Sequence, residues 1–219
     1  MSEFIHLRII QYAMVICLAA VAGTSVFAQY PEYIPVQDIT SFKKHFAQES
    51  AKVLSITSDF TQEKTLTALT EKITSTGKFW FKRSNKVRLE YTKPFVYLVV
   101  MNGDKLLVRD HQKESRIHVK SSKLFQQVNR IMIDCVQGTI LESKDFTTRV
   151  FENGTTLLLE MTPVPKTLRE FFQTIIITVD KKDYSARSIT MKEPMGDITL
   201  ITFDRKKLNE QIPDTIFTP

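Results

Sequence analysis

Much of this chain consists of short strand-like segments separated by tight turns, which leaves few folds open to it. Asn102-Gly103 and Asn153-Gly154 are hairpin signals, and Ser84-Asn85 marks another turn. Parallel strands need long crossover connections, so segments this close in sequence are predicted to pair antiparallel. The eleven predicted strands are residues 55–66, 70–82, 86–92, 96–101, 105–110, 115–119, 145–151, 155–161, 173–180, 186–192 and 197–204.

Two further segments have apolar residues at helical spacing. The first spans residues 38–53, with Asp38 as its candidate N-cap, and the second spans residues 121–133. Two amphipathic helices cannot cover both faces of a flat sheet this wide. The sheet is therefore predicted to curl, with the helices lying across its concave side. The tail from Asn209 is predicted to be extended.

The first 28 residues have the pattern of a cleaved signal peptide. Arg8 closes a short n-region, residues 9–27 are almost wholly apolar, and Val26-Phe27-Ala28 is a cleavage signature. A transmembrane helix is the alternative for so long an apolar run, but the small residues before Ala28 favour cleavage. We predict an exported mature chain, residues 29–219, that forms a single domain.

The positions of the cysteines and charged residues argue against a lipid anchor, an internal disulfide and a nucleic-acid partner. Cys17 lies deep in the apolar run, after Met14-Val15-Ile16, which is not the setting of a lipid-acceptor cysteine. Cys135 is the one cysteine of the predicted mature chain, so no internal disulfide is expected. The net charge is +6, but the lysines are scattered singly and in pairs rather than interleaved with aromatic residues. We therefore predict no nucleic-acid partner.

No arrangement of residues points to catalysis or metal binding. The predicted mature chain has three histidines, His45, His111 and His118, and no Cys-x-x-Cys or His-x-x-x-His spacing. It also has no Gly-x-Ser-x-Gly elbow and no glycine-rich phosphate loop. His111 and His118 are a weak metal pair and fit better as solvent-facing strand residues. The chain is predicted not to be an enzyme and to use no metal or cofactor.

The segment from Gly77 to Pro94 carries the most information about function. Phe79 and Phe81 fall on one face of its first strand and Trp80 on the other, so both faces bear large rings. One face is therefore expected to meet something other than water.

This segment resembles the periplasmic LolA lipoprotein-carrier family, whose pattern is a glycine, a tryptophan, a basic pair, an asparagine turn and a proline. The matching residues are Gly77, Trp80, Lys82, Arg83, Asn85 and Pro94. Asp59-Phe60-Thr61-Gln62 ahead of it and Asn102-Gly103-Asp104-Lys105-Leu106 behind it also match. Ser84 stands where the family usually has proline, and Val87 where an aromatic residue is common.

The resemblance implies a mainly β fold with helices (α+β): an unclosed antiparallel β-barrel with a helical lid. It also implies a monomeric periplasmic chaperone that carries acylated lipoproteins from the inner to the outer membrane. Its partners would be an inner-membrane lipoprotein-releasing transporter and, where present, an outer-membrane receptor. Two alternatives stay open, a carrier of another lipid or glycolipid and a lipid-sensing envelope regulator with the same fold.

Three groups of residues are the candidate site. The acyl-chain cavity is predicted to be lined by Phe79, Phe81, Leu89, Tyr91, Val99, Met101, Leu157, Leu159, Ile175, Ile177, Met191 and Leu200. The lid is predicted to use Phe42, Phe46, Leu124, Phe125, Val128 and Met132. Arg83 is the candidate latch, because its five donors could bind carbonyl groups on the lid. The alternative is that the apolar residues form an ordinary core without a cavity and that Arg83 belongs to a solvated turn.

Overall fold

The computed structural model describes residues 30–68, 71–83, 85–110, 113–118, 130–131, 134 and 138–218. Residues 35–219 form one compact unit. The predicted signal peptide, Ser84, His111, Cys135 and most of the second predicted helix lie outside the described residues.

One open sheet of twelve strands dominates the described part of the chain, which confirms the predicted fold class. The order is β1-β8-β9-β10-β11-β12-β2-β3-β4-β5-β6-β7. Strands β2 to β12 pair antiparallel throughout. The strands are β1 (Ile34–Pro35), β2 (Ser55–Leu66), β3 (Glu71–Lys82), β4 (Lys86–Lys93), β5 (Tyr97–Asn102), β6 (Lys105–Arg109), β7 (Glu114–His118), β8 (Phe146–Glu152), β9 (Thr156–Pro163), β10 (Thr174–Asp180), β11 (Ala186–Lys192) and β12 (Ile198–Leu208).

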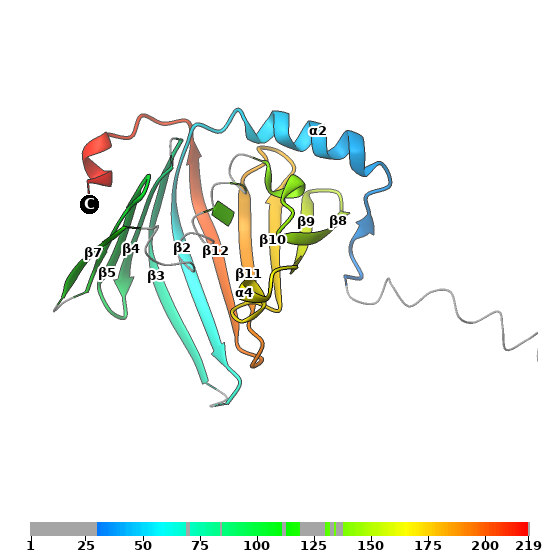
Figure 1. Ribbon diagram of the computed structural model, residues 1–219. Helices are drawn as coiled ribbons and strands as arrows, with labels where there is room; N and C mark the ends of the chain where they lie inside the picture. The colour runs from blue at the N-terminus through cyan, green and yellow to red at the C-terminus, as the bar shows by residue number, and fades with distance from the viewer. Residues whose placement is uncertain are drawn as a thin grey trace, which may run out of the picture. The chain divides into compact units, whose positions relative to one another are not determined.

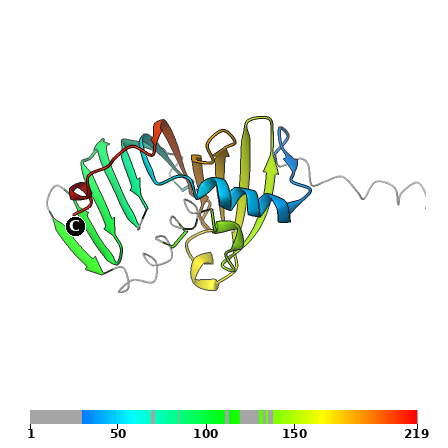
Figure 2. The ribbon, with the colours of Figure 1, turned by 90° about the horizontal axis from the view of Figure 1, so that it is seen from above.

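The sheet is strongly curved, as the view from above shows (Figure 2). Register shifts interrupt three pairings, between Thr76 and Gly77, between Thr178 and Val179, and between Asp204 and Lys207. Such bulges bend a strand and increase its local twist. They help to produce the concave surface that we predicted because two helices cannot cover both faces of a flat sheet.

Helix α2 (Ile39–Ser50) lies across one end of strands β8 to β11 (Figure 1). Its N-cap is Asp38, as predicted, whose side chain accepts a hydrogen bond from the Ser41 amide at 3.0 Å. The helix ends three residues before the predicted boundary. Shorter helical turns that the sequence did not predict are η2 (Ile140–Glu142), α4 (Lys166–Arg169) and η3 (Asp214–Phe217).

The outer face of β3 to β5 is covered by the C-terminal segment, residues 212–217. Ile212 and Phe217 are buried there against Leu98, Val100 and Leu107, with Trp80 beside them. The segment is held by ion pairs from Lys82 and Lys86 to Asp214, at 2.7 and 2.8 Å. Hydrogen bonds from these two lysines lower the pKa of Asp214 to about 2. The tail is therefore not simply extended as predicted, because Trp80 and its neighbours offer it an apolar surface to bury.

Gly77 allows an unusually close approach on the opposite, concave face. A Cβ at this position would lie 2.3 Å from the Glu90 carbonyl oxygen and 2.7 Å from the Phe60 ring. We expect Gly77→Ala to lower the free energy of unfolding by about 1–3 kcal/mol, because backbone and ring must both shift. Chemical denaturation measures this effect. Gly154→Ala is the matched control, since nothing lies within 4 Å of its Cβ position; equal stabilities for both variants would contradict the packing argument.

Candidate functional site

An apolar cavity of about 320 Å³ lies on the concave side of the sheet. Side chains from β2, β3 and β4 form one wall and side chains from β9 to β12 form the other, with Phe46 of α2 also in the lining. Eight predicted cavity residues line it: Phe79, Phe81, Leu89, Tyr91, Leu159, Ile175, Ile177 and Met191. The two walls come from segments far apart in sequence, and only the folded sheet brings them together.

Four predicted cavity residues do not line the cavity. Val99 and Met101 share the concave face but pack in a core cluster with Phe81 and Val87. Leu157 is buried in a second core cluster, beside Leu159. Leu200 faces away from the cavity, because Ile201 lines it and neighbouring strand residues point to opposite faces.

The cavity also includes residues that sequence reasoning did not select. Among them are Ile56, Val87, Val179, Ile189, Ile201 and Phe203. Ile189 and Ile201 face each other as partners in the β11–β12 pairing. Alternation along β12 contains the signal for Ile201 and Phe203, but the apolar residue Leu200 directly before Ile201 hides which face is inward.

One polar pair lies within the cavity wall. The Tyr91 hydroxyl donates a hydrogen bond of 2.9 Å to the side-chain oxygen of Gln62. Burial raises the pKa of Tyr91, since the phenolate would be poorly solvated there. The Phe60 ring contacts the Tyr91 ring edge to face, at 4.9 Å between centroids. Tyr91 is therefore held neutral and hydrogen-bonded, in keeping with an apolar interior.

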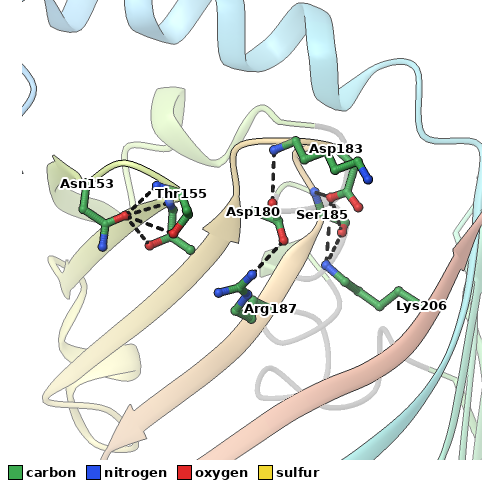
Figure 3. A network of polar contacts seen from close by, with 9 residues as sticks. Asn153, Thr155, Asp180, Asp183, Ser185, Arg187 and Lys206 are labelled. Atoms are coloured by element: carbon green, nitrogen blue, oxygen red, sulfur yellow. Dashed lines mark hydrogen bonds and ion pairs between the residues drawn. The ribbon is translucent and has the colours of Figure 1, made fainter.

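Lys206 and Ser185 form a second polar group in the cavity lining, and Figure 3 shows their contacts. The Lys206 ammonium donates to the Ser185 hydroxyl at 2.5 Å, and that hydroxyl donates to the Asp183 carboxylate at 2.6 Å. Burial lowers the pKa of Lys206, although Asp183 and Asp180 oppose that shift. Sequence reasoning grouped Lys206 only with scattered surface lysines.

The predicted lid is described in part. Phe46 lines the cavity, and Phe42 stacks on it with 5.8 Å between ring centroids. Leu124, Phe125, Val128 and Met132 lie outside the described residues. Ile131, from the same predicted helix, does line the cavity. Gly138 then passes against the end of α2, where a Cβ would lie 2.6 Å from the Cβ of Ser50.

Arg83 binds the carbonyl groups at the C-terminal end of α2. Its guanidinium donates from Nη2 to the Ser50 carbonyl at 2.9 Å and from Nε to the Val53 carbonyl at 2.8 Å. The last carbonyls of a helix have no partner within the helix and carry partial negative charge, so a cation is favourable there. The structure thus places the candidate latch residue at the junction of α2 and β2.

Asn209 holds the same junction from the other side, a contact that sequence reasoning missed. Its side-chain oxygen accepts from the Leu54 amide at 2.7 Å, and its side-chain nitrogen donates to the Lys52 carbonyl at 3.1 Å. The residue has φ of 61°, a left-handed conformation that asparagine tolerates better than most residues. Arg83 and Asn209 together fix the chain between α2 and β2.

A curved antiparallel sheet around an apolar cavity, with a helix over one end, is the architecture of a protein that encloses apolar ligands. The model of one family, "Outer membrane lipoprotein carrier protein LolA", matches residues 51–219. The chain therefore belongs to the LolA family, and the resemblance seen in the sequence is confirmed. In the described residues, no helix has the length and apolarity required for a membrane span.

Similar proteins include an outer-membrane lipoprotein carrier protein from Cupriavidus pinatubonensis, 28% identical over 148 residues. That alignment covers 66% of this chain and spans about 65% of the length of the relative. Among solved structures, a LolA superfamily protein from Nitrosomonas europaea matches with TM-score 0.42 and 11% identity, covering 81% of this chain and 97% of its own. A putative outer membrane lipoprotein-sorting protein domain from Vibrio parahaemolyticus matches with TM-score 0.46 and 9% identity, covering 80% and 94%.

Proposed function

We propose that this protein is a periplasmic carrier that shields the acyl chains of lipoproteins and takes them from the inner to the outer membrane. Family membership supports this function, and the apolar cavity beneath α2 is the observation that carries it. Each methylene kept from water is worth about 0.8 kcal/mol, so an acylated protein needs shielding to cross an aqueous space. Under this proposal the protein acts as a monomer. It receives cargo from a releasing transporter and delivers it to an outer-membrane receptor or to the membrane itself.

The closed cavity is too small for several acyl chains at once. Its volume of about 320 Å³ is at the lower end of the range for drug-sized ligands, about 300–1,000 Å³. Loading therefore requires that α2 move and that Phe46 leave the cavity. The junction at Ser50–Leu54 is the natural hinge, because the hydrogen bonds from Arg83 can be broken and remade there.

The direct experiment supplies the purified mature protein to energised inner-membrane vesicles that contain the releasing transporter and display a newly acylated lipoprotein. A carrier should release the lipoprotein in a soluble one-to-one complex and pass it to acceptor membranes. Lipoprotein that stays in the donor membrane regardless of carrier concentration would end the proposal.

Neighbouring residues of β12 provide a test of the cavity itself. Ile201 lines the cavity whereas Leu200 faces the other way. We expect Ile201→Asp to reduce capture of lipoprotein at least tenfold, because a carboxylate in the cavity would have to be desolvated beside the acyl chain. Leu200→Asp should leave capture within twofold of the unchanged protein. The reverse pattern in a pull-down of soluble complexes would refute this assignment of the two faces.

A carrier of another lipid is the second candidate, and the small closed cavity favours it, since one chain fits more readily than three. Mass spectrometry of lipid that co-purifies with the protein separates the two. Lipoprotein fragments support the first function, and a single free lipid or glycolipid supports the second.

A further inference from the structure

A β-bulge in β12 turns a lysine into the cavity. Ile201 and Phe203 line the cavity, so strict alternation would bring Arg205 inward next. The register shifts between Asp204 and Lys207, however, and Arg205 takes a left-handed conformation with φ of 51°. Lys206 lines the cavity instead. Bulges commonly re-aim a side chain beside a functional site.

The backbone conformation at this bulge has a cost. A positive φ is unfavourable for a residue with a long side chain, and arginine lacks the local hydrogen bonding that helps asparagine. The Arg205 side chain is directed outward, where it pairs with Asp59. A surface ion pair contributes little. The feature that the bulge produces is the inward position of Lys206.

Lys206 is the one charged residue among the described side chains that line the cavity. Its side chain is 14% exposed. Its hydrogen bond is to the neutral Ser185 hydroxyl, and its ion pair with the Asp183 carboxylate is long, at 3.9 Å. Arg187 on β11 also disfavours the charged form of Lys206. An ammonium group in such a place gains from a further oxygen ligand with negative charge.

A buried hydroxyl lies opposite the bulge in the paired strand. Asp204 pairs with Asp59 and Lys207 pairs with Thr57, so Arg205 and Lys206 together oppose Ser58. Ile56 lines the cavity, and Ser58 shares its face of β2. The Ser58 hydroxyl is buried and has no hydrogen-bond partner within the described structure. Ser58 itself is not part of the cavity lining, so its unpaired hydroxyl can bind an oxygen ligand only after the side chains that cover it move.

We propose that Lys206, held in place by Ser185 and with Ser58 opposite it, forms a head-group subsite for a single-chain lipid that ends in a carboxylate or a phosphate. The chain of such a lipid would occupy the apolar cavity, and its anionic head would lie beside the Lys206 ammonium. The cavity volume of about 320 Å³ suits a single chain better than several. This subsite deepens the proposed carrier function and rests on the same cavity.

Binding of palmitate and of its neutral methyl ester to the delipidated mature protein tests the subsite. Charged hydrogen bonds commonly contribute enough for about tenfold in affinity, so palmitate should bind about tenfold more tightly than the ester. Lys206→Met should remove that preference and Lys206→Arg should keep it. Lys207→Met is the matched control, since Lys207 is 66% exposed and pairs with Glu210.

The outcomes separate the subsite from the carrier function. If palmitate and its ester bind equally well, or if Lys206→Met keeps the preference for palmitate, the subsite is refuted. Binding of both ligands would still support the cavity as a lipid-binding site. If neither ligand binds, the cavity and the proposed function fail together. Ser58→Ala should weaken the binding of palmitate and leave the binding of the ester unchanged. If the Ser58 hydroxyl has only a structural role, the binding of both ligands should be unchanged.

A parallel measurement with 1-palmitoyl lysophosphatidate distinguishes the sources of the anionic head. If only palmitate binds more tightly than the methyl ester in a way that depends on Lys206, the subsite is assigned to carboxylates. If only the lysolipid does so, the subsite is assigned to phosphates. Either result supports the proposal, and loss of the preference for both would overturn it.

Discussion

Replacing Arg83 with leucine is expected to slow delivery of cargo at least tenfold. The substitution removes two charge-assisted hydrogen bonds, to the carbonyls of Ser50 and Val53. Such bonds contribute about 1.5–3 kcal/mol each, and they hold the end of α2 in the position that keeps Phe46 in the cavity. The loaded form becomes relatively more stable, so the protein retains its cargo. A transfer assay from the soluble complex to acceptor membranes measures the rate.

The fold should tolerate this change better than delivery does. The Arg83 backbone amide still donates to the Leu54 carbonyl, at 2.9 Å, and Asn209 still holds the junction. A loss of about 3 kcal/mol should lower the unfolding midpoint of the lipid-free protein by about 6–12 °C and leave it folded at the assay temperature. Arg116→Leu is the control, because Arg116 is an exposed arginine that pairs with Glu114 on β7. If the Arg83→Leu variant delivers cargo at an unchanged rate, Arg83 does not act as a latch.

Replacing Phe217 with alanine is expected to lower the free energy of unfolding by about 3–5 kcal/mol, the usual cost of emptying a fully buried aromatic site. Phe217 is 0% exposed, and it covers the outer face of β4 and β5. Its loss would also expose Trp80, so urea titrations followed by tryptophan fluorescence report the effect. The cavity is on the opposite face, and lipid binding below the unfolding transition should persist.

Phe95 provides the matched control for Phe217. It is 73% exposed in the loop between β4 and β5, and Phe95→Ala should change stability by no more than about 0.5 kcal/mol. A loss of under about 1 kcal/mol for Phe217→Ala would show that the C-terminal segment is not integral to the folded unit.

The strands were predictable because their signals are local. Period-two alternation and turn residues such as Asn102-Gly103 and Asn153-Gly154 identify each hairpin, and β2 and β11 have the predicted bounds. Asp38 likewise predicts its own helix start. Boundaries shifted where packing extended a strand, as in β12, which continues to Leu208 after a bulge that no local pattern signals.

The candidate site was predictable only in part, and the misses have a common cause. In β12, Leu200 and Ile201 are equally apolar, and the pairing of Ile201 with Ile189 decides which one faces inward. Lys206 appears in the sequence as half of a surface lysine pair. It reaches the cavity only because Arg205 adopts a left-handed conformation within the folded sheet.

The amino-acid sequence determined the antiparallel hairpins, the start of α2 and the family, since these depend on residues close together along the chain. The tertiary structure decided which side chains enclose the cavity, how Arg83 and Asn209 hold the end of α2, and where the C-terminal segment packs. Those features join residues that are distant in the chain, by 155 positions for Asn209 and Leu54. Their contacts depend on the curvature and register of the whole sheet, which short-range patterns do not encode.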